Sequence, residues 1–598
     1  MKNRLLLTSV IRPFGGPGEG DSVGAELFHA QVTRAQGIFS LRQVIRCWAI
    51  DYLAGNIETP CTVLHYPSER EFVRELKSGR YSHVGINFVV ATFHKARKMS
   101  ELVRRHAPGA RIIFGGYGTV LPDSLLSPFA DHICREEGIG FLRKLLDEPL
   151  DRPVVHPYAP IPTVRMYSYQ QPALVAHVTA GLGCPNGCDF CCTSHFFKRK
   201  YVPFARTGRE IFDALVRMDD LAREHGDQIS GYILIDEDFF LHKPRAQEFL
   251  SLVRQHGRSF PLMGFGSVKG LSQFSADEIA EMGFETIWTA FEGVNSGYGK
   301  LQGKSLDDLY ASLNSRGINI LASMIIGFPY QTREQILKEF DYLMKLKPSL
   351  YQVLIYFAFP GTPFHQQVMA EGRYLPNYQE NPDLRRWDGF SMHFQHPNFT
   401  AAELEALQKD LFRQDFARLG PSIVRLLRVW HEGSRNLKDS PNPILKDRAR
   451  KLTQSTRDAL PALTPPMLFG PTRQSRREAR QLFVDIVRFN GGLTWTEAVF
   501  SLLSPVLAVW TWIALRLGIF QQPALLRLEH RMDQPAEKAQ PVTRIQGGFQ
   551  ASPASVLAED IAGHVSRLFD TARLKPNNGW ERQPSELTRP EPQAKDAA

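Results

Sequence analysis

A short loop decides how this chain folds: Gly183-Cys184-Pro185-Asn186-Gly187-Cys188-Asp189-Phe190-Cys191-Cys192. Within it, Cys184, Cys188 and Cys191 form a C-x-x-x-C-x-x-C pattern. The glycines, proline and asparagine let such a loop bend three thiolates toward one point. Cys192 follows directly, so we expect its side chain to point elsewhere. Cysteine thiolates, normally four, hold iron–sulfur clusters, and three ligands leave one iron open to an exogenous ligand.

A Cys3His zinc site is the alternative, because His195 lies four residues beyond Cys191. Structural zinc sites usually join two separated pairs of ligands, whereas these four ligands lie in one short loop, so the spacing favours the iron–sulfur cluster. Seven cysteines in 598 residues exclude a disulfide scaffold. The grouping of four of them indicates metal chemistry in a reducing compartment, which for this chain means the cytoplasm.

The region 173–375 around the loop alternates strand and helix signals. Ser/Thr-x-x-Glu/Gln capping boxes open helices at Thr207, Ser275 and Thr332. Six strand–helix units predict a partial (β/α)6 barrel, with the active site at the carboxyl ends of its strands. We expect these strands at 174–180, 232–235, 262–266, 286–291, 318–326 and 351–357.

Residues 1–150 show the same alternation and predict a separate doubly wound parallel sheet of the Rossmann or flavodoxin type. Glycine-rich loops at 14–20 and 115–118 follow two of its strands, where a ligand can approach the backbone. Residues 151–172 contain five prolines and are expected to be a linker. The strands are expected at 5–11, 62–65, 83–90 and 111–114, and the helices at 41–53, 69–76 and 93–106.

The cysteine motif, with Phe190 before its last cysteine and a barrel's first strand before it, resembles that of the radical S-adenosylmethionine (AdoMet) enzymes. The resemblance covers roughly residues 165–375. It implies that Cys184, Cys188 and Cys191 hold a 4Fe–4S cluster whose open iron binds AdoMet. Reductive cleavage of AdoMet then gives a 5′-deoxyadenosyl radical, and Phe190 packs near the adenine.

Three further segments match looser landmarks of that family. Asp236-Glu237-Asp238 corresponds to the segment after strand two that contacts the AdoMet amino group. Glu292 corresponds to a strand-four acid that faces the ribose, and the segment 325–329 with Ile326 corresponds to the approach to adenine. Solvated strand ends and a buried strand ending in a turn remain the plain structural alternatives for these segments.

The domain order resembles the cobalamin-dependent subclass of these enzymes. Gly115, Gly116 and Gly118 match its fourth-strand Gly-Gly segment, where the nucleotide tail of cobalamin threads between sheet and helices. A nucleotide-binding or ligand-free sheet is the alternative. The sequence lacks the D-x-H-x-x-G motif, which implies a cobalt without a protein histidine as its lower ligand.

Residues 376–530 are expected to form a helical region, and residues 531–598 a largely disordered tail with one helix signal at 554–574. The stretch 498–520 is long enough for a membrane span, but Pro505 and Arg516 interrupt it. Residues 421–490 hold 14 Lys and Arg against 6 Asp and Glu. Arginines beside an apolar helix predict peripheral membrane contact, and an ordinary buried helix is the equal alternative.

We therefore expect a cytoplasmic, cobalamin-dependent radical AdoMet enzyme that methylates an unactivated carbon of a small-molecule or lipid-like substrate. The resemblance also implies an electron donor such as flavodoxin or ferredoxin. A radical oxidative cyclase or rearrangement enzyme without net methyl transfer is one alternative, and a non-catalytic cobalamin- or lipid-binding protein is another. A nucleic-acid partner is not expected, because the basic residues lack interleaved aromatics.

Overall fold

The structure is a computed structural model that describes residues 4–14, 28–171, 173–293, 295–379, 382–517 and 523–530. Most of the glycine-rich loop at 14–20, and the tail 531–598 with its helix signal, lie outside the described residues. The chain divides into two compact units, and the second takes up residues from Trp512 within one long helix. Both large sheets and the candidate site belong to the first unit.

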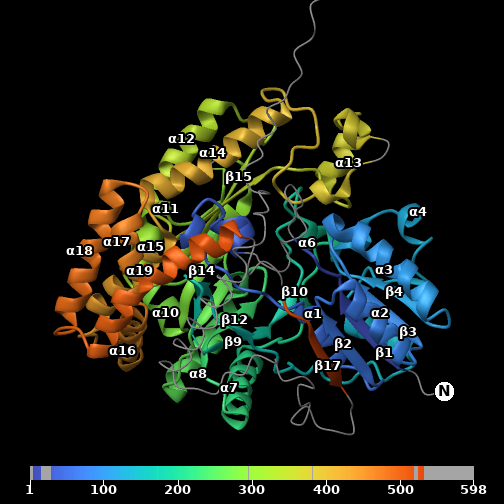
Figure 1. Ribbon diagram of the computed structural model, residues 1–598, viewed down its shortest axis with the longest axis horizontal. Coiled ribbons are helices and arrows are strands. Elements are labelled where there is room, and N and C mark those ends of the chain that lie inside the picture. The colour runs from blue at the N-terminus through green and yellow to red at the C-terminus, as the bar shows by residue number, and fades with distance from the viewer. Residues whose placement is uncertain are drawn as a thin grey trace, which may run out of the picture. The chain divides into compact units, whose positions relative to one another are not determined.

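The N-terminal sheet is doubly wound, as predicted. Its parallel strands run in the order β2-β1-β3-β4-β5. Alternate residues of β1 face opposite layers, because Leu6 belongs to the buried cluster that contains Phe72 and Leu7 to the one that contains Ile50. The elements are β1 (Leu5–Ser9), α1 (Trp48–Gly55), β2 (Cys61–His65), α2 (Glu69–Ser78), β3 (His83–Asn87), α3 (Phe93–His106), β4 (Arg111–Gly115), β5 (His132–Ile133) and α5 (Gly138–Leu145) (Figure 1).

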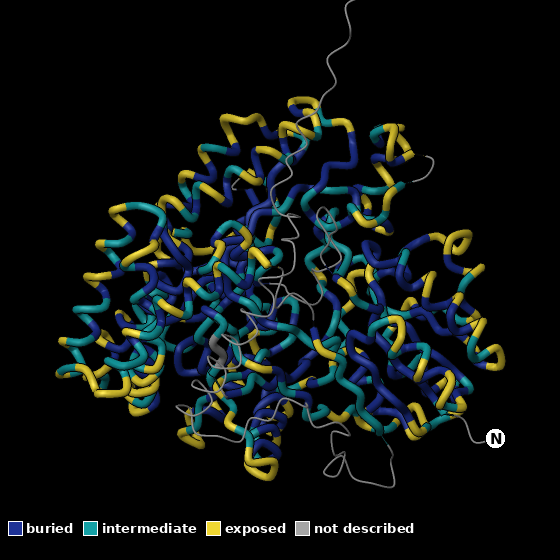
Figure 2. Tube along the Cα trace, in the orientation of Figure 1, coloured by how far each residue is buried: buried dark blue, intermediate teal, exposed yellow. Residues whose placement is uncertain are grey.

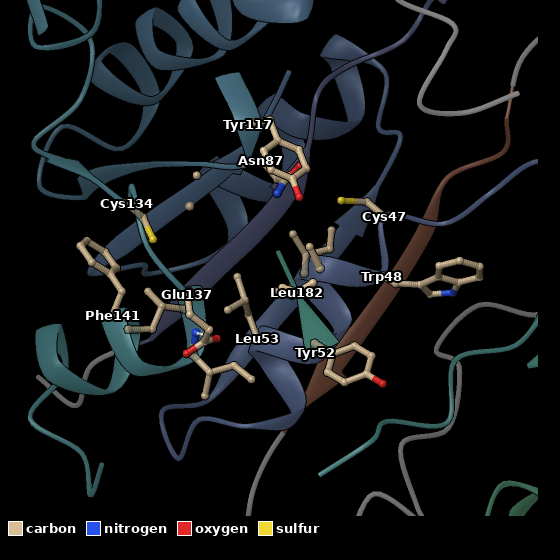
Figure 3. Close-up of a pocket in the computed structure, with 18 of the residues that line it drawn as sticks. Cys47, Trp48, Tyr52, Leu53, Asn87, Tyr117, Cys134, Glu137, Phe141 and Leu182 are labelled. Carbon is tan, nitrogen blue, oxygen red and sulfur yellow. Dashed lines mark hydrogen bonds between the residues drawn. The ribbon is translucent and has the colours of Figure 1, made fainter. Parts of the chain in front are cut away.

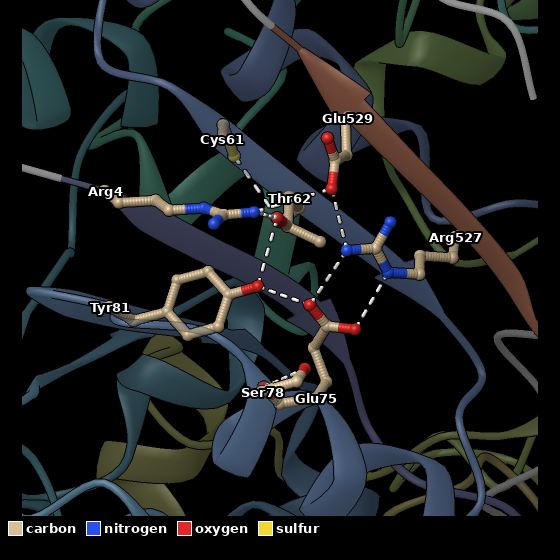
Figure 4. Close-up of polar contacts among 8 residues, drawn as sticks. All are labelled: Arg4, Cys61, Thr62, Glu75, Ser78, Tyr81, Arg527 and Glu529. Carbon is tan, nitrogen blue, oxygen red and sulfur yellow. Dashed lines mark hydrogen bonds and ion pairs between the residues drawn. The ribbon is translucent and has the colours of Figure 1, made fainter. Parts of the chain in front are cut away.

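A strand from the far end of the chain closes one edge of this sheet. β17 (Leu526–His530) pairs antiparallel with β2. The Arg527 guanidinium donates two hydrogen bonds to Glu75, at 2.8 and 3.0 Å, and a third to Glu529 (Figure 4). The sequence predicted only helices in this region, because five alternating residues are too few to show a strand period.

The second sheet is an open barrel whose six parallel strands follow one another in chain order, as predicted. A short strand, β6 (Ile161–Pro162), pairs antiparallel with β9, so the expected linker contributes an edge strand to the barrel. The strands are β9 (Leu174–Thr179), β12 (Ile229–Ile235), β13 (Leu262–Phe265), β14 (Phe284–Glu292), β15 (Asn319–Ile326) and β16 (Leu350–Ile355). The helices between them include α7 (Gly208–His225), α8 (Lys243–His256), α10 (Ala276–Glu281), α11 (Leu306–Asn314) and α12 (Arg333–Leu346).

Helices dominate the chain after the barrel, and in Figure 2 the outer coils of the trace carry exposed residues while much of its interior is buried. These helices are α13 (Pro363–Ala370), α14 (Ala401–Leu419), α15 (Ser422–Leu437), α16 (Pro443–Asp458), α17 (Thr464–Phe469), α18 (Arg473–Phe489) and α19 (Trp495–Arg516). The predicted capping box of Thr400 and Glu403 opens α14. Among the described helices, α19 is the one whose length and apolar composition would suit a membrane span.

Candidate active site

The cysteine loop runs from β10 (Gly181–Leu182) to α6 (Cys192–Phe196), at the carboxyl end of the first barrel strand. Two glycines give the loop its shape. Gly183 has φ +81°, and a Cβ there would lie 2.3 Å from the carbonyl oxygen of Lys200. Gly187 has φ +69° and accommodates the Arg199 guanidinium. The Ser194 hydroxyl donates to the Cys184 carbonyl at 2.7 Å and accepts from the Gly187 amide at 3.1 Å.

The three predicted cluster ligands lie on this one loop. Burial raises the pKa of Cys184 to about 11 and that of Cys188 to about 12, and it also raises the pKa of Cys191. Within the described part of the chain, no three His, Cys, Asp or Glu side chains are already arranged around one metal position. The donor set fits a three-thiolate cluster, and binding must displace the thiol protons.

His195 does not join these thiols. Its Nε2 lies 3.0 Å from the carbonyl oxygen of Cys188, so the ring braces the loop backbone. The four-residue spacing that suggested a zinc ligand has another cause. His195 lies one helical turn after Cys191, so its side chain comes back to the cysteine loop.

The three acids after β12 have different roles. Asp236 is buried, with its carboxylate 2.5 Å from Arg245 and accepting from the Tyr201 hydroxyl at 2.8 Å. Asp238 joins the cysteine loop to the end of β13, because it accepts from the Asn186 amide at 3.2 Å and from the Ser267 backbone at 3.0 Å.

Glu237 alone among these acids lines the large cavity described below. Burial and the charge of Asp236 raise its pKa to about 7. The Asp236 carboxylate accepts from Arg245, and the prediction that Asp236 and Glu237 contact AdoMet stays a prediction. Glu237 is the acid of this segment that lines the cavity.

Glu292 ends β14 with a left-handed φ of +48°. One carboxylate oxygen forms an ion pair with Lys300, and the other is buried without a hydrogen-bond partner among the described residues. Burial raises its pKa. Because an unpaired buried oxygen costs free energy, this site suits a ligand that brings hydroxyl donors.

Phe190 and Ile326 pack in two different hydrophobic clusters. The Phe190 ring stands edge-on to Tyr298 and Tyr356, both at 5.6 Å, in an aromatic cluster beside the cysteine loop. Ile326 is fully buried in the barrel core, so only its backbone could approach a ligand. The Gln331 side chain fixes the turn after Ile326, since its Oε1 accepts from the Gly327 and Phe328 amides at 2.8 and 3.1 Å.

A largely apolar cavity of about 450 Å³ lies between the carboxyl ends of the N-terminal strands and the barrel (Figure 3). Helices α1 and α5 line one side of it, and residues next to the cysteine loop line the other. Its lining includes Cys47, Trp48, Tyr52, Leu53, Asn87, Gly115, Gly116, Tyr117, Cys134, Glu137, Phe141, Thr179, Leu182, Phe196 and Glu237.

The three predicted glycines differ in what surrounds them. Gly115 lines the cavity, and a Cβ there would meet nothing within 4 Å. Gly116 also lines it, but with φ +88° and a would-be Cβ 2.7 Å from the Phe88 carbonyl oxygen. Gly118 lies outside the lining and packs against the Phe88 ring, where a Cβ would stand at 2.2 Å. Gly115 therefore borders open space in the cavity, and Gly118 serves close packing.

Sequence reasoning missed Lys300, Tyr298 and Gln331. Lys300 pairs with Glu292, and the Tyr298 hydroxyl donates to Asp189 of the cysteine loop at 2.5 Å. Their signal was weak, because they lie more than 100 positions from the cysteine motif in a loop with no pattern of its own.

No family model matches the chain. An uncharacterized methyltransferase of Pyrococcus horikoshii is 22% identical over an alignment of 402 positions, and the match covers 58% of this chain and 85% of that protein. The structure of the radical S-adenosylmethionine methyltransferase TsrM from Kitasatospora setae, with cobalamin and a [4Fe-4S] cluster bound, has a TM-score of 0.50 at 15% identity. The match covers 77% of this chain and 100% of that one. A second TsrM structure, with tryptophan and an AdoMet analogue, has a TM-score of 0.47 at 15% identity over 70% and 88% of the two chains.

Proposed function

We propose that this chain, which has the fold of a radical AdoMet enzyme with an N-terminal cobalamin-type domain, is a cobalamin-dependent methyltransferase acting on an unactivated carbon. The observation that carries the proposal is the placement of the cysteine loop, Glu237 and the glycine-edged cavity at one junction of the two sheets. Parallel sheets bind ligands at this edge. Residues 1–150 would serve as the cobalamin domain and 173–375 as the AdoMet barrel.

Each cofactor has residues whose chemistry fits it. Cys184, Cys188 and Cys191 would hold a 4Fe–4S cluster. Glu237 would accept from the AdoMet amino group, and the unpaired oxygen of Glu292 would accept from a ribose hydroxyl. The cavity edge at Gly115 and Gly116 would take part of cobalamin. When bound, the cluster supplies the electron for AdoMet cleavage and cobalamin supplies the transferred methyl group.

The protein's own contribution is to position these groups and to exclude water. The cavity lining is mostly apolar, so a charged group inside it interacts strongly with Glu237. All seven cysteines are free, which supports a reducing cytoplasmic setting. A flavodoxin or ferredoxin would supply the electron, and the substrate would be a small or lipid-like molecule.

The test is incubation of anaerobically reconstituted protein with methyl-labelled AdoMet, cobalamin, dithionite and a cell extract as the source of substrate. The proposal predicts 5′-deoxyadenosine together with labelled product. 5′-Deoxyadenosine with an unlabelled product would favour the oxidative cyclase or rearrangement enzyme. Iron-loaded protein that leaves AdoMet unchanged would contradict radical chemistry altogether.

We further propose that α19 rests on an anionic membrane surface. The helix turns small and polar residues inward, since Ser504 and Ala508 are buried, and turns Leu502 and Val506 outward with 77% and 62% exposure. Exposed arginines of the preceding helix complement an anionic surface, where each contributes about 1 kcal/mol. These are Arg473, Arg477 and Arg480.

Introducing charges at Leu502→Glu and Val506→Glu should abolish binding to phosphatidylserine vesicles in a flotation assay, because the apolar face could no longer enter the headgroup layer. Met369→Glu, at an apolar residue of α13 that is 60% exposed, is the matched control and should bind normally. Truncating the chain before Arg473 is a poorer test, because it also removes β17 from the N-terminal sheet. Absence of vesicle binding by the unmodified protein would contradict the proposal, and binding that survives carbonate would indicate a span.

A further inference from the structure

Lys300 occupies an enclosed position behind the cysteine loop. It lies in the short turn Gly299–Leu301, its side chain is 15% exposed, and its ammonium forms an ion pair with Glu292. The same ammonium lies 5.6 Å from the centre of the Phe190 ring and 5.9 Å from that of Tyr298. Both rings belong to the aromatic cluster that covers the loop, so the lysine is held from several sides.

Lys300 lies against the part of the loop that carries two of the predicted cluster ligands. Phe190, whose ring faces the ammonium, stands between Cys188 and Cys191 in the chain. Two residues before the lysine, the Tyr298 hydroxyl donates to Asp189 of the same segment at 2.5 Å. A largely buried cation is therefore fixed beside this segment.

One carboxylate oxygen of Glu292 forms the ion pair with Lys300, and the other has no hydrogen-bond partner among the described residues. The register between β14 and β15 shifts at Ala290/Glu292, and the residue adopts the left-handed backbone region. Such a conformation is unfavourable for a residue with a side chain, so it persists where the surroundings require it. The pairing keeps the lysine in a fixed place and does not use up the whole carboxylate.

We propose that Lys300 is a positioning residue that makes the 4Fe–4S cluster easier to reduce. When the cluster takes up one electron, the negative charge on its thiolates and sulfides grows, and a fixed buried cation stabilises the reduced form. Glu292 opposes this effect in part and sets its size. The inference rests on the proposed function, because it requires the cluster on Cys184, Cys188 and Cys191.

The test is a redox titration of the reconstituted full-length protein without AdoMet, with dithionite as the electron source and electron paramagnetic resonance as the readout. Lys300→Met should lower the equilibrium constant for reduction at least tenfold, which for one electron is about 59 mV toward more negative potential. Glu292→Gln should shift the potential in the positive direction, because it leaves the lysine uncompensated. Lys300→Arg keeps the charge and should stay close to the unmodified protein.

Lys304→Met is the matched control, since Lys304 lies four residues further on and its ammonium donates to the Phe274 carbonyl at 2.8 Å. Its potential should not change. Equal potentials in Lys300→Met and the unmodified protein would overturn the inference. If Lys300→Met assembles no cluster, Glu292→Gln decides, and an unshifted potential there overturns it. Absence of a cluster from the unmodified protein would instead refute the proposed function.

Discussion

Cys188→Ser should remove the iron–sulfur cluster and with it AdoMet cleavage. The proposed ligand set gives the cluster three thiolates where four are normal, so none of the three is spare. Loss of a group that merely supports a metal ligand costs about 10–100-fold, so loss of a ligand itself should exceed about 100-fold in AdoMet cleavage. Iron and sulfide content and the visible absorption of anaerobically reconstituted protein measure the first effect.

Cys192→Ser is the matched control for this experiment. Cys192 is the next residue after Cys191, it begins α6, and burial raises its pKa as it does for the three predicted ligands. Its variant should keep the full iron content. If Cys188→Ser kept a normal iron–sulfur spectrum, or if Cys192→Ser lost it, the ligand assignment would be wrong.

Gly115→Val should weaken cobalamin binding by roughly 10–100-fold, because added volume in a packed site costs about 1–3 kcal/mol. A Cβ at this position would meet nothing within 4 Å, so the melting temperature should stay close to that of the unmodified protein. Equilibrium dialysis with cobalamin measures the affinity. Gly109→Val, also in open space but before the amino end of β4, should bind normally.

Gly116 is a worse position for that test, although the sequence motif includes it. Its left-handed φ and the nearby Phe88 carbonyl mean that a side chain there would strain the sheet itself. A cobalamin affinity in Gly115→Val equal to that of the unmodified protein would contradict the assignment of this cavity.

Elements with strong local patterns could be predicted from the sequence. The barrel strands are continuous apolar runs, and capping boxes mark where the next helix begins, such as that of Thr332 and Gln335 at the start of α12. The order of the strands could therefore be predicted from the spacing of these signals. The strand β17 was missed because its pairing with β2 joins residues more than 450 positions apart. Long-range pairing of that kind leaves no local signal.

In the candidate site, too, local motifs could be predicted from the sequence and features that depend on tertiary contacts could not. The cysteine triad is a local motif, and sequence alone could name it. Which acid of Asp236 and Glu237 faces the cavity depends on Arg245, which lies on the following helix and takes the first of them. The sequence of α19 fitted a buried helix and a surface helix equally well. The orientation of its faces is a tertiary property, fixed by what the rest of the chain packs against Ser504 and Ala508.

Three cysteines of one loop are proposed to hold a cluster whose remaining iron binds AdoMet. The electron paramagnetic resonance spectrum of the reconstituted, dithionite-reduced protein, recorded with and without AdoMet, tests this assignment. A reduced 4Fe–4S signal should appear, should change when AdoMet is added and should be absent from Cys188→Ser. A signal that AdoMet leaves unchanged, or a reconstituted protein with no such signal, would contradict it.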